Sequence, residues 1–270
     1  MKFRHLLFTF ILSFGCTALG HTQSTASAQV STFSIEAPQL QTIKTIWVYL
    51  PKTYSDSTNS YPVFYMHDAQ NLFDTASSFA GEWQIDEYLD SIAESHSIII
   101  GIEHGNDQRM HELTPYSNEK YGGGNADAYL DFIIKTLKPH IDTTYRTLKD
   151  SKYTTIFGSS LGGLLSFYAV IKHPETFNNA GVFSPSFWFS KDIFDLVSGS
   201  HVSADSRFYF LAGSQESETM VPDQQKMVAL LLKKGVSRDQ LQNIIIEGGQ
   251  HNEALWRENS PKAYQWLHKN

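Results

Sequence analysis

The sequence predicts an α/β protein in which helices cover both faces of a mostly parallel central sheet. Short apolar runs, typical of buried strands, alternate along the chain with longer amphipathic patterns typical of helices. This alternation indicates parallel strands connected by helices that pack on the sheet. The expected strands are residues 43–50, 62–66, 97–102, 152–157, 180–183, 207–211 and 243–246, and the expected helices are residues 82–94, 127–137, 161–172, 221–234 and 253–268.

The N-terminal residues have the pattern of a secretory signal peptide. Lys2 and Arg4 precede an apolar run at residues 6–14, no acidic residue accompanies them, and small residues follow. The apolar run is too short to predict a membrane span. We therefore expect export of the protein to the periplasm or the extracellular space.

Two positions fit cleavage of this signal. Ala26-Ser27-Ala28 has the small-x-small pattern of a cleavage site, and Ala18-Leu19-Gly20 is a second option. With cleavage at the first position, residues 1–28 are the signal and residues 29–270 form one enzyme domain, within the usual size of a single α/β core. An uncleaved anchor helix and a lipoprotein acylated on Cys16 are the alternatives.

Charge and cysteine content exclude several classes of function. The formal net charge is −7, and loss of Lys2 and Arg4 with the signal changes it to −9. An acidic protein repels nucleic acids and anionic lipids, so a neutral or extracellular small-molecule substrate is expected. Cys16 is the single cysteine, and a mature chain without it has no thiol catalysis, no disulfide and no cysteine-bound zinc.

Two polar segments are predicted to lie outside the regular elements. Residues 21–34 are rich in Ser, Thr, Ala and Gln, which is typical of a solvated linker. Residues 55–60 are expected to form a hairpin loop between the first two strands.

A nucleophile is expected at the end of the fourth strand. The run Gly158-Ser159-Ser160-Leu161-Gly162 lies between this strand and a helix pattern, which is the context of a nucleophile elbow. Glycines on both sides of Ser160 allow the helix to approach closely while the serine takes a strained turn conformation that exposes its hydroxyl. We expect Ser160 to be the nucleophile; a turn of small residues without chemistry is the alternative.

The base and the acid that a serine nucleophile requires are expected downstream, with the acid first. His251 follows the last strand after a glycine pair and precedes the last helix, so it is the expected base. The acid should follow the preceding strand, where Ser214-Gln215-Glu216-Ser217-Glu218 offers two glutamates. Glu216 is preferred because it lies nearer the strand end. Glu218 is the alternative, although an acid there could instead begin the next helix.

Two backbone amides are expected to bind the oxyanion. Leu161 follows the nucleophile and supplies the first, and Gln70 or its neighbour Ala69, in the loop after the second strand, supplies the other. His67 and Asp68 in that loop could instead form a metal pair, but no third ligand at metal-like spacing accompanies them. Neither a metal nor a cofactor is therefore expected.

Two further sets of side chains have candidate roles near the site. Phe187 and Trp188 follow the end of the strand at 180–183, where they could line a substrate pocket or pack in the core. Arg109 and Glu112 are expected to form a salt bridge that braces a loop. Contact of Arg109 with a substrate carboxylate is the alternative.

Several stretches resemble the esterase D-like family of α/β-hydrolases, which includes siderophore, feruloyl and acetylxylan esterases and mycolyltransferases. The resemblance implies an α/β-hydrolase fold, with Ser160 as nucleophile, His251 as base and an acid from the Glu216 loop. It spans nearly all of the chain after the signal. The matching stretches are Val48-Tyr49-Leu50-Pro51, residues 61–74, Gly158-Ser159-Ser160-Leu161-Gly162-Gly163, Phe183-Ser184-Pro185-Ser186-Phe187-Trp188 and Gly249-Gln250-His251-Asn252-Glu253-Ala254-Leu255-Trp256.

The chain departs from this family at two positions. Ala69 stands where relatives often have glycine, and its side chain restricts the backbone that must present the oxyanion donor. Gln250 replaces a usual glycine before the histidine. The signal peptide argues against the cytosolic branch of the family, which hydrolyses formyl thioesters.

These observations predict an exported serine esterase that hydrolyses a small-molecule, glycan or siderophore ester through an acyl-enzyme on Ser160. An acyltransferase on the same residues, in which an alcohol replaces water as the acceptor, is one alternative. A non-catalytic glycan- or siderophore-binding module is the other, and it would bind ligand without forming an acyl-enzyme.

Overall fold

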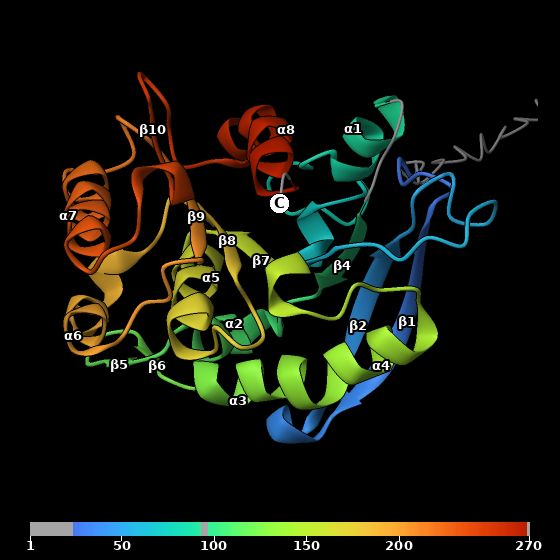
Figure 1. The fold of residues 1–270 in the computed structure, drawn as a ribbon, viewed down its shortest axis with the longest axis horizontal. Coiled ribbons are helices and arrows are strands. Elements are labelled where there is room, and N and C mark those ends of the chain that lie inside the picture. Colours follow the sequence, from blue (N-terminus) through green and yellow to red (C-terminus); the bar gives the residue numbers. More distant parts are fainter. Residues whose placement is uncertain (1–23, 93–96, 269–270) are drawn as a thin grey trace, which may run out of the picture.

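An eight-stranded sheet runs through the centre of the protein (Figure 1). The computed structural model describes residues 24–92 and 97–268. The strands lie side by side in the order β1-β2-β4-β3-β7-β8-β9-β10. Their bounds are Val30–Ala37 (β1), Thr42–Tyr49 (β2), Val63–His67 (β3), Ile98–Ile102 (β4), Thr154–Ser159 (β7), Asn179–Phe183 (β8), Arg207–Gly213 (β9) and Leu241–Ile246 (β10).

The sheet is parallel from β4 to β10 and antiparallel at its other edge. Strands β1 and β2 form an antiparallel pair, and β2 is antiparallel to β4. All later pairs, from β4 with β3 to β9 with β10, are parallel. The predicted mostly parallel sheet is confirmed, and its carboxyl ends meet along one edge, where open α/β sheets carry their sites.

Helices cover both faces of the sheet. Neighbouring strand residues point to opposite sides, so Tyr65 of β3 packs in one hydrophobic core while Phe64 and Met66 pack in the other. In Figure 1, α1 and α8 lie together against one face, and α3 and α4 lie beyond the other. The helices are Ile85–Ser91 (α1), Arg109–Leu113 (α2), Ala126–Phe132 (α3), Lys138–Thr144 (α4), Leu161–Lys172 (α5), Asp192–Gly199 (α6), Met220–Lys233 (α7) and Glu253–His268 (α8).

The predicted linker at residues 21–34 is wrong for residues 30–34, whereas residues 24–29 lie outside the helices and strands. Strand β1 begins at Val30 and pairs along its length with β2. Phe33 and Ile35 alternate with polar residues and pack against the core, an alternation that the Ser- and Thr-rich composition hides. Before the strand, the Ser24 hydroxyl donates to Asp74 Oδ2 at 2.6 Å and the Ser27 amide donates to Asp86 Oδ2 at 2.7 Å.

The predicted hairpin around residues 55–60 is also wrong. Strand β4 lies between β2 and β3, so the two strands that flank this loop are not paired with each other. Arg146 holds the loop instead, because its side chain donates to the backbone oxygens of Tyr54 and Asn59.

Within the described residues, no helix has both the length and the apolar composition that a membrane crossing needs.

Candidate active site

The turn between β7 and α5 has the geometry of a nucleophile elbow. Ser160 adopts φ 57° and ψ −120°, a strained conformation for a residue with a side chain. A Cβ on Gly158 would lie 2.9 Å from both the Gly162 carbonyl carbon and His67 Cδ2, so only glycine fits there. The expected strand, turn and helix are confirmed, and the tight turn presents Ser160 at the carboxyl edge of the sheet.

His251 and Glu216 form a hydrogen-bonded pair at the same edge. His251 Nδ1 lies 2.7 Å from Glu216 Oε2, and the glutamate side chain is fully buried. His251 precedes α8, and Glu216 follows β9. A carboxylate only accepts hydrogen bonds, so this contact places the proton on Nδ1 and leaves Nε2 free as a base. Glu218, the alternative acid, is exposed.

Further donors satisfy the buried Glu216 carboxylate. Its Oε1 accepts the Gly213 amide at 2.5 Å and the Ser184 hydroxyl at 2.7 Å. The Trp256 indole N–H donates in turn to Ser184 Oγ at 2.8 Å, and the indole ring meets the His251 ring edge-on with centroids 5.0 Å apart. These contacts fix the carboxylate without neutralising it.

Sequence reasoning missed the roles of Ser184 and Trp256. Both lie in stretches that carry the family resemblance, but 72 positions separate them along the chain. The available signal was their position, since Ser184 directly follows β8 and Trp256 lies in the first turns of α8. No spacing rule predicts a hydrogen bond between them.

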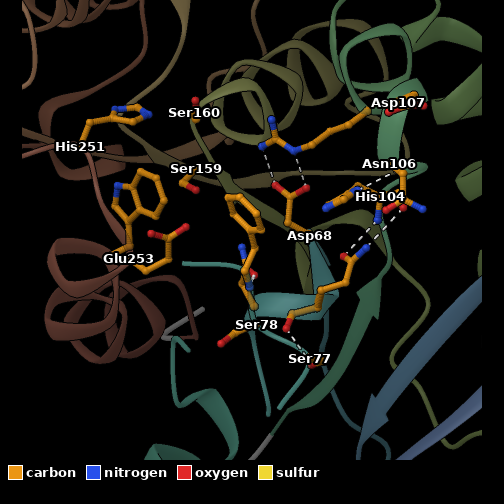
Figure 2. Close-up of a pocket in the computed structure, with 15 residues that line it drawn as sticks. Asp68, Ser77, Ser78, His104, Asn106, Asp107, Ser159, Ser160, His251 and Glu253 are labelled. Carbon is orange, nitrogen blue, oxygen red and sulfur yellow. Dashed lines mark hydrogen bonds and ion pairs between the residues drawn. The ribbon is translucent and has the colours of Figure 1, made fainter. Parts of the chain in front are cut away.

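Ser160 and His251 line one open pocket of about 810 Å³ (Figure 2). In Figure 2 the His251 ring faces the side of the pocket that holds Ser160. The Ser160 hydroxyl lies 3.3 Å from Ser186 Oγ, and among the described residues that is its hydrogen-bond contact. Nucleophile–base hydrogen bonds are often formed only when substrate binds. The pocket is also lined by Asp68, Gln70, Asn71, Ser77, Ser78, Phe79, His104, Asn106, Asp107, Arg109, Ser159, Glu253 and Trp256.

The expected oxyanion donors are unused amides near this pocket. Within the described residues, the backbone N–H groups of Leu161 and Gln70 donate to no acceptor. The left-handed residue of the Gln70 turn is Asp68, at φ 57°, so Ala69 itself needs no glycine-like conformation. Ala69 is fully buried. Its methyl group fits because residue 101 is glycine, since a Cβ atom added to Gly101 would lie 2.9 Å from Ala69 Cβ.

The predicted Arg109–Glu112 salt bridge is wrong, because each residue has another partner. Arg109 forms a bidentate pair with Asp68, with Nε–Oδ1 at 2.7 Å and Nη2–Oδ2 at 2.8 Å. Glu112 is buried and accepts both Lys44 Nζ, at 2.6 Å, and the Gly105 amide. Burial would raise the pKa of Asp68, but the Arg109 guanidinium outweighs it and lowers this pKa below its ordinary value.

His67 is buried beneath the elbow rather than exposed to the pocket. Its Nδ1 lies 3.3 Å from the Tyr129 hydroxyl, and its Nε2 has no hydrogen-bond partner. Burial lowers its pKa to about 4, so the ring is neutral at physiological pH. Both carboxylate oxygens of Asp68 accept hydrogen bonds from Arg109. His67 and Asp68 therefore do not form the metal pair considered from the sequence.

Phe187 and Trp188 do not line the pocket that contains Ser160. Phe187 is buried and packs edge-on against Phe167 and Phe194, which is the core alternative considered for it. Trp188 is half-exposed and stacks edge-on with Tyr121 elsewhere on the surface. The pocket has a different aromatic residue at its rim, Phe79, which is 95% exposed.

Comparison with known families identifies the class of this site. The family model described as Putative esterase matches residues 37–267, which include every residue of the candidate site. The chain belongs to the Putative esterase family. It is therefore an enzyme of the esterase class, and its fold is that of the α/β-hydrolase structures it resembles.

Three of the proteins to which the chain is similar come from Bacillus. The chain is 27% identical over 238 residues to an uncharacterized protein, YbbA, of Bacillus subtilis, covering 82% of this chain and 91% of that protein. It is 30% identical over 148 residues to the ferri-bacillibactin esterase BesA of the same organism, covering 48% of this chain and 50% of BesA. The crystal structure of the BES protein from Bacillus cereus has the same fold, with a TM-score of 0.72 at 19% identity over 94% of this chain and all of that one.

Proposed function

We propose that this esterase hydrolyses a carboxylic ester through an acyl-enzyme on Ser160. One observation carries the proposal: His251, whose Nδ1 lies 2.7 Å from Oε2 of the buried Glu216, lines the same pocket as a serine held at φ 57°. A nucleophile, a base and a buried acid that orients the base are the groups that acyl transfer requires. Glu216 rather than Glu218 is the acid in this proposal.

The reaction proceeds in two halves. Ser160 Oγ attacks the ester carbonyl while His251 Nε2 takes its proton, and Glu216 stabilises the imidazolium that forms. The amides of Leu161 and Gln70 donate to the oxyanion, and collapse of the tetrahedral intermediate expels the alcohol, which receives the proton from His251. Water then attacks the acyl-enzyme with His251 as base, which releases the acid and restores Ser160.

The substrate that we propose is a polar ester of siderophore type. The pocket is open and lined mostly by polar side chains, with the exposed Phe79 ring at its rim. BesA, 30% identical over about half of each chain, carries the name ferri-bacillibactin esterase, which supports this substrate class. Hydroxyl-rich acyl groups suit such a lining better than long alkyl chains do.

We also propose that the enzyme acts outside the cytoplasm. The basic and then apolar N-terminus supports export, although residues 1–23 lie outside the described residues. Hydrogen bonds from Ser24, Thr25 and Ser27 to the folded domain favour cleavage at Ala18-Leu19-Gly20 over cleavage after Ala28. N-terminal sequencing of protein recovered from the culture medium or periplasm tests the export and the position of cleavage.

Turnover of p-nitrophenyl acetate and butyrate by the purified protein and by Ser160→Ala tests the hydrolase. We expect measurable release of p-nitrophenol, reduced by at least ~10³-fold in the variant. A folded Ser160→Ala protein that retained wild-type turnover would refute the proposal. A siderophore triester is the next substrate, with the freed hydroxy-acid as the product to detect.

A further inference from the structure

Three carboxylates gather at the start of α1, directly after the stretch that supplies Ser77, Ser78 and Phe79 to the active-site pocket. One oxygen each from Glu82, Asp86 and Glu87 lies within 4.8 Å of the other two. Glu82 is 3% exposed and Asp86 is fully buried. Among the residues that the structure describes, no lysine, arginine or histidine forms an ion pair with any of the three. Three carboxyl groups are therefore held together without a cation from the protein.

Each of these carboxylates has one buried oxygen without a hydrogen bond. The second oxygens of Glu82 and Asp86 are used: Glu82 Oε2 accepts the Thr75 hydroxyl at 2.6 Å and the Thr25 hydroxyl at 3.0 Å, and Asp86 Oδ2 accepts the Ser27 amide at 2.7 Å. Glu82 Oε1, Asp86 Oδ1 and Glu87 Oε2 have no partner. Buried carboxylate oxygens without donors are costly, so this arrangement points to a missing positive ligand.

We propose that Glu82, Asp86 and Glu87 bind a calcium ion. Carboxylate oxygens are the ligands that hard divalent cations prefer, and calcium accepts them at about 2.3–2.6 Å in flexible geometry. Two oxygens on opposite sides of such an ion lie up to roughly 5 Å apart, so a spacing within 4.8 Å fits one calcium. Magnesium requires shorter bonds and near-ideal octahedral geometry, and it keeps more of its water, which a buried cluster accommodates poorly.

The ion would tie three separate segments together. Glu82 and Thr75 bracket the stretch that carries Ser77, Ser78 and Phe79, which line the active-site pocket. Thr25 and Ser27 bring the N-terminal segment to the same carboxylates. Calcium binding therefore stabilises the pocket wall and the docked N-terminal segment without contacting the reacting atoms.

Calcium titration of chelator-treated protein that retains residues 24–28 tests the site. We expect one ion bound per chain in calorimetry, and a rise in Tm of roughly 5–10 °C at a calcium concentration about 100-fold above the Kd. Glu87→Gln should weaken calcium binding at least ~10-fold. Asp90→Asn is the matched control on the same helix, because Asp90 has Lys52 as its ion-pair partner, and it should keep the calcium response.

Two results would overturn the calcium site. One is folded wild-type protein that shows neither heat nor a Tm shift with Ca²⁺ up to about 10 mM, above the Kd of weak extracellular calcium modules. The other is an equal response in Glu87→Gln and wild type. The same titration of Ser160→Ala should reproduce the wild-type response, so the test is independent of the proposed hydrolysis.

Discussion

Two groups of buried carboxylates in this protein differ in how their oxygens are satisfied. Glu216 accepts hydrogen bonds from a backbone amide, a serine hydroxyl and His251, and both of its oxygens are used. Glu82, Asp86 and Glu87 each keep one buried oxygen without a partner. The first arrangement is complete within the chain and fixes one histidine tautomer, whereas the second is complete only with a ligand.

Removing the charge of Glu216, whose two oxygens both accept hydrogen bonds, should have the largest effect on activity. In Glu216→Gln an amide replaces the carboxylate that accepts the His251 N–H. The ring is then no longer held in one tautomer, and the imidazolium loses its counter-charge. We expect kcat to fall by about 10³- to 10⁴-fold with little change in KM, measured on a p-nitrophenyl ester. Glu218→Gln is the control and should stay near wild type; the reverse order would assign the acid to Glu218.

Another buried titratable group, His67, should contribute to acid sensitivity. Its folded-state pKa of about 4 lies below the ordinary 6.5, so the unfolded chain binds the extra proton between these values. Neutral His67 therefore costs no stability above pH 6.5, and its contribution should lower the free energy of unfolding by about 3 kcal/mol as the pH drops to 4. Urea unfolding at several pH values measures this, and an unchanged profile in His67→Asn would exclude His67 as the cause.

Partial loss of donors at Glu216 should have an intermediate effect. Ser184→Ala removes the hydroxyl between the Trp256 indole N–H and Glu216 Oε1 and leaves both groups buried with one partner fewer. We expect the free energy of unfolding to fall by about 1–3 kcal/mol and kcat to fall about tenfold. Chemical denaturation and steady-state kinetics measure the two effects. Loss of stability without any change in kcat would show that Ser184 does not position the acid.

Removing a charge from the cluster of Glu82, Asp86 and Glu87 should instead stabilise the protein. In chelator at pH 8, Glu87→Gln removes one of three crowded negative charges, so the free energy of unfolding should rise by about 1 kcal/mol. Turnover should stay within about twofold of wild type, because none of these carboxylates lines the active-site pocket. Denaturation curves with and without calcium measure the change, and a loss of stability in chelator would contradict the repulsion.

The sequence predicts the parts of the site that follow from chain order. Ser160, Glu216 and His251 each follow a parallel strand, and the carboxyl ends of such strands meet at one edge. The pairing of Arg109 with Asp68 could not be predicted, because 41 residues separate them and Glu112 offered a nearer partner. The carboxylate cluster could not be predicted either, because the burial of its unpaired oxygens depends on the folded structure and not on the spacing of the residues along the chain.

Strand β1 shows the same limit in the fold. Its polar composition resembles that of a linker, yet alternate apolar residues such as Phe33 and Ile35 pack on the core once β2 supplies a partner. The order of β2, β4 and β3 likewise depends on pairing between distant segments, which the local pattern of residues 55–60 does not encode.

Covalent labelling of the nucleophile tests the central claim most directly. Three serines lie close together here, since Ser159 and Ser160 both line the pocket and Ser186 Oγ is 3.3 Å from Ser160 Oγ. Folded protein treated with a fluorophosphonate should carry one label per chain on Ser160, located by peptide mass spectrometry, and Glu216→Gln should label more slowly. A label on Ser159 or Ser186, or an enzyme that hydrolyses esters with Ser160 unlabelled, would contradict the account.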